Sequence, residues 1–176
     1  MIMTNYMDLL AANSPWNLIL FMVIPVVAAE ALVAAEFYAL FLGEGKNAGW
    51  RKFEKQLGIF AGVYFAGVVT YLLTSVVPTL EWKGLLDQIA VISYLMGIIP
   101  LGGIALLELG ILWQNMPSEK RAQKHFQLLI GFLVISHIAM IFGMVDPGIA
   151  GYSPDKAVPA VSAPAVEMDH HHHHHH

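Results

Sequence analysis

The chain has 176 residues, of which 57% are hydrophobic and only 12% are charged. A water-soluble domain has roughly 25% charged residues, so this composition favours a membrane protein. The formal net charge of −4 is too small to indicate a charged partner, and the nine Lys and Arg residues form no aromatic-interleaved patch typical of nucleic-acid binding. The absence of cysteine excludes disulfides, thiolate nucleophiles and Cys-ligated metal clusters.

Residues 1–15 are predicted to form an extracytoplasmic N-terminal segment, in which residues 1–13 lie on the membrane surface as a short amphipathic element. No Lys or Arg precedes the first apolar run, and that run is longer than the core of a cleaved signal peptide. The sequence Asn13-Ser14-Pro15 is typical of a helix start. We therefore expect the first run to be a retained membrane helix.

Four apolar runs predict four transmembrane helices, over residues 16–42, 57–77, 88–113 and 126–145. Runs of about 20 to 26 residues at about 1.5 Å per residue cross a hydrocarbon core of roughly 30 Å. Each run ends close to glycine or proline. The expected fold is an all-α integral membrane protein, an up-and-down bundle of four transmembrane helices in one domain, residues 16–146.

The loops predict the orientation of this bundle. Seven of the nine basic residues fall between the first and second or the third and fourth runs: Lys46, Arg51, Lys52, Lys55, Lys120, Arg121 and Lys124. The positive-inside rule then places both termini outside the cytoplasm, with a prokaryotic inner membrane as the expected location. Residues 147–169 are predicted to be a flexible Pro/Ala-rich tail. Residues 170–176 are a run of histidine typical of a purification tag, so only His125 and His137 enter the analysis of sites.

Small residues recur on the first two predicted helices, as Ala28, Ala31, Ala35 and Ala39 and as Gly58, Gly62 and Gly67. Such faces let membrane helices approach closely. Pro25 lacks an N–H group and therefore frees the carbonyl of Phe21, four residues earlier.

Several ionisable residues lie within the apolar runs, where the surroundings are predicted to be lipid or the interior of the protein. Glu30 and Glu36 fall in the first run, Glu108 in the third and His137 in the fourth. A charged side chain at bilayer depth costs several kcal/mol unless it is paired, neutral or coordinated, so these residues are the candidate functional site. Counting along the helices predicts three levels: His125 at the cytoplasmic mouth, Glu36 with Glu108, and Glu30 with His137.

These residues are consistent with a metal ion of the Fe, Mn or Zn class held by Glu30, Glu36, Glu108 and His137, because carboxylate and imidazole suit such ions. The Glu-x-x-His pairs of di-iron bundles are absent. Glu30 and Glu36 point about 120° apart around one helix, and so do His125 and His137. A single site that uses all of these residues is therefore not expected, and the pairs Glu36–Glu108 and Glu30–His137 are favoured.

Three alternatives stay open. A b-type haem would use His137 with Met96 as axial ligands. A proton pathway through His125, Glu36, Glu108 and Glu30 would serve a proton-coupled transporter or channel. Interhelical hydrogen bonds alone would suit a structural accessory subunit.

The leading hypothesis is a membrane-embedded protein with a metal or haem cofactor and a redox or electron-transfer role. The catalytic residues, and whether the chain is an enzyme at all, are left open. The expected partners are the lipid bilayer and either a second copy or a larger membrane complex.

Overall fold

The computed structural model describes residues 3–42 and 48–152, and these residues form helices and loops without any strand. Residues 1–2, 43–47 and 153–176 lie outside the description, and with them most of the expected tail and the whole of the expected tag. Four helical spans are long and apolar enough to cross a membrane: Trp16–Ala39, Ala48–Thr79, Leu85–Glu108 and Ser118–Met144. The predicted all-α architecture with four long apolar helices is confirmed.

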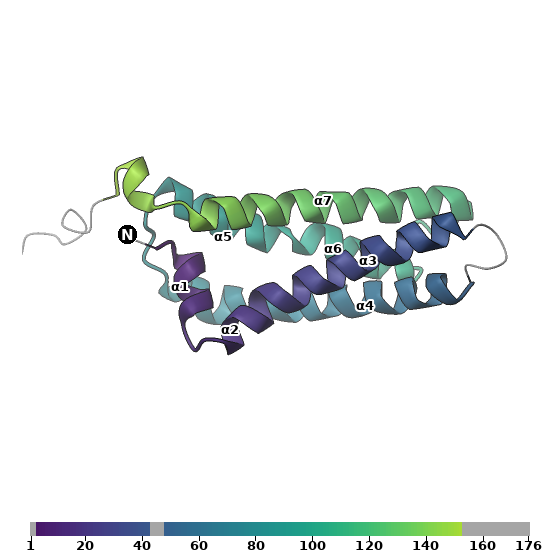
Figure 1. Ribbon diagram of the computed structural model, residues 1–176, viewed down its shortest axis with the longest axis horizontal. Coiled ribbons are helices and arrows are strands. Elements are labelled where there is room, and N and C mark those ends of the chain that lie inside the picture. The colour runs from purple at the N-terminus through teal and green to yellow at the C-terminus, as the bar shows by residue number, and fades with distance from the viewer. Residues whose placement is uncertain (1–2, 43–47, 153–176) are drawn as a thin grey trace, which may run out of the picture.

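The first hairpin pairs two long helical spans (Figure 1). Its first span consists of α2 (Trp16–Leu18), the π-helical turn η1 (Ile19–Val23) and α3 (Ile24–Phe41). Its second span consists of α4 (Ala48–Tyr71), the π-helical turn η2 (Leu72–Val76) and the 3-10 turn η3 (Val77–Thr79).

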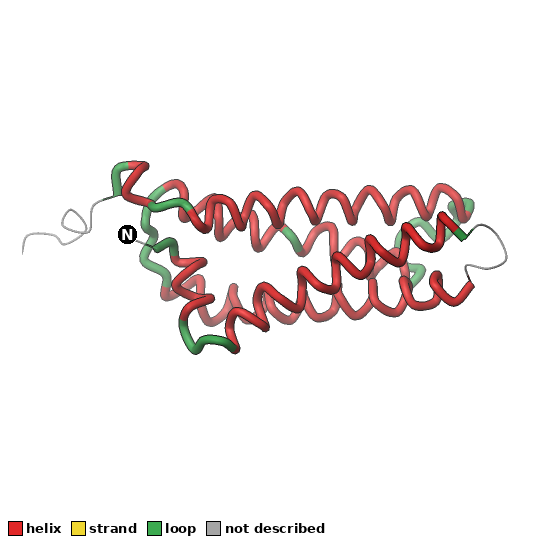
Figure 2. The backbone as a smooth tube through the Cα atoms, viewed as in Figure 1, coloured by secondary structure: helices red, strands yellow, loops and turns green. Residues whose placement is uncertain are grey.

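The second hairpin has the same form. Its first span is broken at Gly97 into α5 (Leu85–Met96) and α6 (Ile98–Glu108), a break that is visible as a short loop within the tube in Figure 2. Its second span is α7 (Ser118–Met144), which is followed by the short 3-10 turn η4 (Pro147–Ala150).

The helix ends differ from those that hydropathy predicts. α4 begins at Ala48 and α7 at Ser118, well before the expected residues 57 and 126. Lys, Arg and Gln are good helix formers, so the backbone stays helical through charged turns that hydropathy assigns to loops. The third span ends at Glu108, ahead of the expected residue 113, because Gly110 follows with a left-handed φ of 76°.

Helices α4 and α6 approach each other closely. A Cβ atom added at Gly62 would lie 2.4 Å from the Cβ of Ala105 and 2.7 Å from the carbonyl oxygen of Leu101. On α3, the alanine face is buried at Ala28 and Ala35. These small residues therefore act as packing surfaces, as membrane helices commonly use them, but the prediction is wrong for Gly67, which is exposed and has no atom within 4 Å of an added Cβ.

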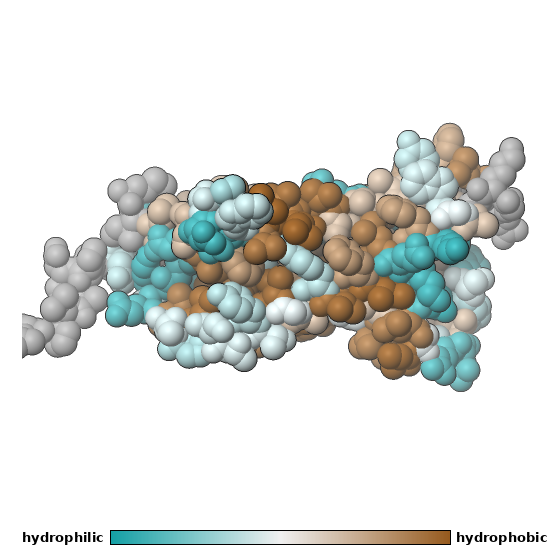
Figure 3. All heavy atoms as spheres, turned by 90° about the horizontal axis from the view of Figure 1, so that it is seen from below, coloured by the Kyte–Doolittle hydropathy of each residue, from teal (hydrophilic) through white to brown (hydrophobic). Residues whose placement is uncertain are grey.

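On the face drawn in Figure 3, the surface is mainly hydrophobic along the middle of the bundle, and hydrophilic residues gather toward its two ends. Large apolar side chains such as Phe37, Val63 and Ile141 are about two-thirds exposed. A band of this kind matches the hydrocarbon core of a bilayer.

The N-terminal segment caps one end of the bundle. Its helix α1 (Asn5–Ala11) buries Tyr6 against the bundle, and its backbone and side chain at Asn5 both donate hydrogen bonds to the Asp87 carboxylate. Thr4 donates to the carbonyl of Gly143 at the end of α7. The segment thus forms a short helix that is docked on the bundle, and its expected place on the membrane surface stays a prediction.

We expect Gly62→Ala to lower the free energy of unfolding by about 1–3 kcal/mol, because the added methyl group would overlap the backbone of α6. Thermal or denaturant unfolding in detergent would measure the change. Gly67→Ala is the matched control, since nothing lies within 4 Å of its added Cβ and alanine favours the helix. Equal losses in both variants would contradict this packing.

Candidate metal centre

Three ionisable side chains from three helices converge inside the end of the bundle that carries most of the basic residues. Glu36 comes from α3, Glu54 from the second turn of α4 and His125 from the second turn of α7. Their relative exposures are 2%, 5% and 1%. We call these three residues the triad.

The triad has the dimensions of a metal site. The Nδ1 atom of His125 lies 3.1 Å from Glu54 Oε1 and 3.5 Å from Glu36 Oε2. One ligand atom from each residue lies within 4.8 Å of the other two. Ligand atoms about 2.0–2.2 Å from a shared ion lie roughly 3.0–3.5 Å apart, so small side-chain movements would bring all three onto one ion.

The hydrogen-bonding capacity of the triad is largely unused. Glu36 Oε2, Glu54 Oε2 and both ring nitrogens of His125 are buried and have no hydrogen-bond partner. Neither contact of Nδ1 with a carboxylate is therefore a well-directed hydrogen bond. Buried polar atoms are nearly always satisfied, so four orphaned atoms at one point indicate a ligand, an ion or water that completes the site.

A fourth acidic residue, from the remaining helix, lies beside the triad. Glu108 ends α6, and its Oε2 atom is 3.8 Å from Nη2 of Arg121. The same guanidinium donates a hydrogen bond to the carbonyl of Leu107. Arg51 of α4 is close enough to act electrostatically on Glu36 and Glu54. All four spans thus contribute an ionisable group at this end.

The structure brings together only part of the predicted set. Glu36 and His125 are in direct contact, although the sequence assigned them to different levels, and Glu108 is their neighbour. Glu30 and His137 are outside this cluster, and both are exposed. From the Glu36–His125 contact, Glu30 lies about 9 Å and His137 about 18 Å farther along the bundle, so the two do not share a level.

Glu54 was missed by the sequence analysis, because it precedes the apolar run expected to start at residue 57. A usable signal was present in the glycine pattern of the same helix. Glu54 lies four residues before Gly58 and eight before Gly62, on one face of α4. Extending the small-residue face by one turn would have placed this carboxylate at the helix interface.

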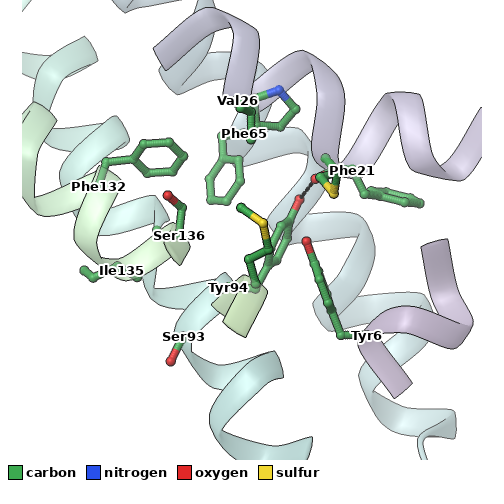
Figure 4. Close-up of a pocket in the computed structure, with 13 residues that line it drawn as sticks. Tyr6, Phe21, Val26, Phe65, Ser93, Tyr94, Phe132, Ile135 and Ser136 are labelled. Atoms are coloured by element: carbon green, nitrogen blue, oxygen red, sulfur yellow. Dashed lines mark hydrogen bonds between the residues drawn. The ribbon is translucent and has the colours of Figure 1, made fainter. Parts of the chain in front are cut away.

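A second feature of the interior lies nearer the opposite end. A cavity of about 30 Å³ lies between α3, α4, α5 and α7. The side chains of Phe65, Tyr94, Phe132 and Ser136 line it (Figure 4). The Tyr94 hydroxyl donates a hydrogen bond to the carbonyl of Phe21, the group that Pro25 leaves free. Burial raises the pKa of Tyr6, on the α1 side of this cavity, to about 12.

The cavity is separated from the triad by apolar packing. Ser136 is eleven residues, about 16 Å, beyond His125 along α7, and the buried side chains of Leu129 and Phe132 come between them. The triad and the polar groups that line the cavity are therefore two separate polar sites in this structure.

The interior suits a single ion better than a haem. Two cavities in the described part of the chain measure about 30 and 20 Å³, which is room for one or two water molecules each. The side chains of His137 and Met96 are exposed, and Nδ1 of His137 lies 2.6 Å from the carbonyl oxygen of Leu133. A haem held by His137 would have to lie outside the bundle.

A family model described as a family of unknown function, DUF6803, matches residues 1–159 of the chain. The chain belongs to this family. The match includes all four long spans and every residue of the triad. No curated protein and no solved structure is significantly similar to the chain.

Proposed function

We propose that the protein is a membrane-embedded metal-binding protein whose ion is held by Glu36, Glu54 and His125. The observation that supports this most directly is the set of four buried, orphaned ligand atoms in the triad. Two carboxylates and one neutral imidazole carry two negative charges, which a divalent cation would balance. Without a cation, one of the two carboxyl groups would have to hold a proton, because two neighbouring buried carboxylates cannot both stay ionised.

The ligand types suggest which ions the site would take. Two carboxylates with one imidazole suit Fe, Mn or Zn, and the chain offers no thiolate to select softer ions. Iron or manganese would supply one-electron redox chemistry, and zinc would not. A redox role for the protein therefore requires that the native ion is iron or manganese.

A proton pathway is less well supported by the geometry. It needs polar groups or water along the whole bundle, but apolar side chains fill the interior between the triad and the cavity at the other end. Glu30, the expected intermediate, is on the outer surface. Metal binding requires no such connection.

Metal titration and elemental analysis of the purified protein would test the proposal. The chain should end at Asp169 in this experiment, because the seven terminal histidines would bind the same ions. We expect one equivalent of Fe, Mn or Zn per chain. Glu36→Gln, Glu54→Gln and His125→Ala should each weaken binding by at least about a hundredfold, since each removes a direct ligand.

Glu30→Gln and His137→Ala are the matched controls, because they change the same residue types outside the triad. Both should bind the ion as the unaltered chain does. A protein that holds no stoichiometric ion, or variants of the triad and controls that lose it equally, would contradict the proposal.

We further propose that both termini lie outside the cytoplasm and that the triad opens toward the cytoplasm. The basic residues at the start of α4 and α7 support this orientation. Since the chain has no cysteine, single cysteines report topology directly. In intact cells an impermeant maleimide should label Glu81→Cys, and it should label Gln114→Cys only after permeabilisation. The reverse pattern would invert the orientation.

A role as a subunit of a larger membrane complex is favoured by a separate observation. Glu30 and His137 each lie in the middle of an exposed stripe of otherwise apolar residues, the first with Val27 on α3 and the second with Val134 on α7. An ionisable group facing lipid at this depth costs several kcal/mol. Polar side chains of a partner's transmembrane helices would satisfy both groups.

A photo-crosslinking amino acid that replaces Val27 or Val134 should form adducts with another protein when the chain is irradiated in the cell membrane. The same residue at Val63, on an exposed face of α4, is the control and should not. The adducts should disappear when Glu30→Leu and His137→Leu are added, because the polar contacts that position the partner are lost. Adducts with lipid alone at all three positions would contradict this role.

A further inference from the structure

The two ring nitrogens of His125 have different neighbours. Nδ1 faces the carboxylates of Glu36 and Glu54, whereas Nε2 points away from them and is buried without a partner. A neutral imidazole that binds an ion through Nδ1 carries its proton on Nε2. The bound ring would therefore need a hydrogen-bond acceptor on its other side.

The small face of α4 leads to the residue that can supply this acceptor. A Cβ atom added at Gly58 would lie 3.8 Å from His125 Nε2 and 3.5 Å from Glu108 Cγ. Nε2 and the Glu108 side chain thus border the same small space, which exists because residue 58 has no side chain. The added atom would also lie only 2.9 Å from Ile104 Cγ2, so this space has no room for a methyl group.

The carboxylate of Glu108 forms an ion pair with Arg121 but no directed hydrogen bond with it. Its nearest cation, Arg121, is 3.8 Å away, which is beyond hydrogen-bond distance, and Arg121 donates to the Leu107 carbonyl instead. Within the described parts of the chain, no hydrogen bond fixes the Glu108 side chain. Its side chain is 14% exposed, so it lies at the edge of the buried site.

We propose that Glu108 is the positioning residue of the metal centre: its carboxylate accepts the Nε2–H of His125 while Nδ1 binds the ion. Such a carboxylate–histidine–metal arrangement fixes the tautomer and the orientation of the ring and makes the nitrogen a stronger ligand. The inference rests on the proposed metal site and adds the fourth helix to it. Glu108 acts through His125 and does not bind the ion itself.

Metal affinity measured by titration of the chain ending at Asp169 with Mn²⁺ or Zn²⁺ would test this role. Glu108→Leu removes the acceptor and should weaken binding about 10- to 100-fold, with one ion per chain retained. Glu108→Gln keeps a neutral carbonyl acceptor and should show a smaller loss. Arg121→Gln is the control for a change of charge beside Glu108, and it should change the metal affinity less than Glu108→Leu does.

A second measurement separates positioning from a general structural effect. In the ¹⁵N spectrum of the Zn²⁺-loaded protein, His125 should show a protonated Nε2 with a strongly deshielded hydrogen. This signal should move toward that of an unbonded imidazole N–H in Glu108→Leu. Gly58→Ala should have a similar effect, because its methyl group would occupy the space between the two side chains.

The outcomes distinguish this inference from the proposed function. If the triad variants lose the ion while Glu108→Leu binds it with unchanged affinity and an unchanged His125 spectrum, the positioning role is wrong and the metal site stands. If Nδ1 carries the proton in the loaded protein, the role is also wrong. If the unaltered chain binds no ion, both proposals fail together.

Discussion

Two glycines on one face of α4 set the distance at which the helices pack, and the candidate metal centre depends on that distance. Gly62 brings the backbone of α6 against α4, and one turn earlier Gly58 leaves space for Ile104, Glu108 and the ring of His125. The same face of α4 carries Glu54, whose Oε1 atom lies 3.1 Å from Nδ1 of His125 on α7. A larger residue at either glycine would move helices and ligands together.

The ionisable residues of the bundle fall into two groups with different physical needs. Glu36, Glu54 and His125 are withdrawn from any surrounding solvent or lipid, so their charges must be balanced within the protein. Glu30 and His137 face outward along the helices, where the proposed partner helices would contact them. The same composition therefore supports both an internal binding site and an external interface, and the two uses do not compete.

The end that carries α1 has a different chemistry. There the polar groups have hydrogen-bond partners. Asp87 accepts hydrogen bonds from Asn5, and the Tyr94 hydroxyl donates to the carbonyl of Phe21, which Pro25 leaves free. These contacts join α1 to the bundle and satisfy the backbone at the π-helical turn before Pro25, which is a structural role. The contrast with the orphaned atoms of the triad is what makes the triad, and not the aromatic cavity, the candidate site.

The amino-acid sequence by itself determined the four long apolar helices, their small packing faces and the presence of Glu36, Glu108 and His125 at one end, since hydropathy and periodicity are properties of each helix alone. Only the tertiary structure decided that Glu54 joins Glu36 and His125 and that Glu30 and His137 face outward. The physical reason is that convergence depends on how far each helix is rotated and shifted along its neighbours. The rotation and shift of each helix are set by the packing between helices, above all where Gly58 and Gly62 let neighbouring atoms approach α4 closely.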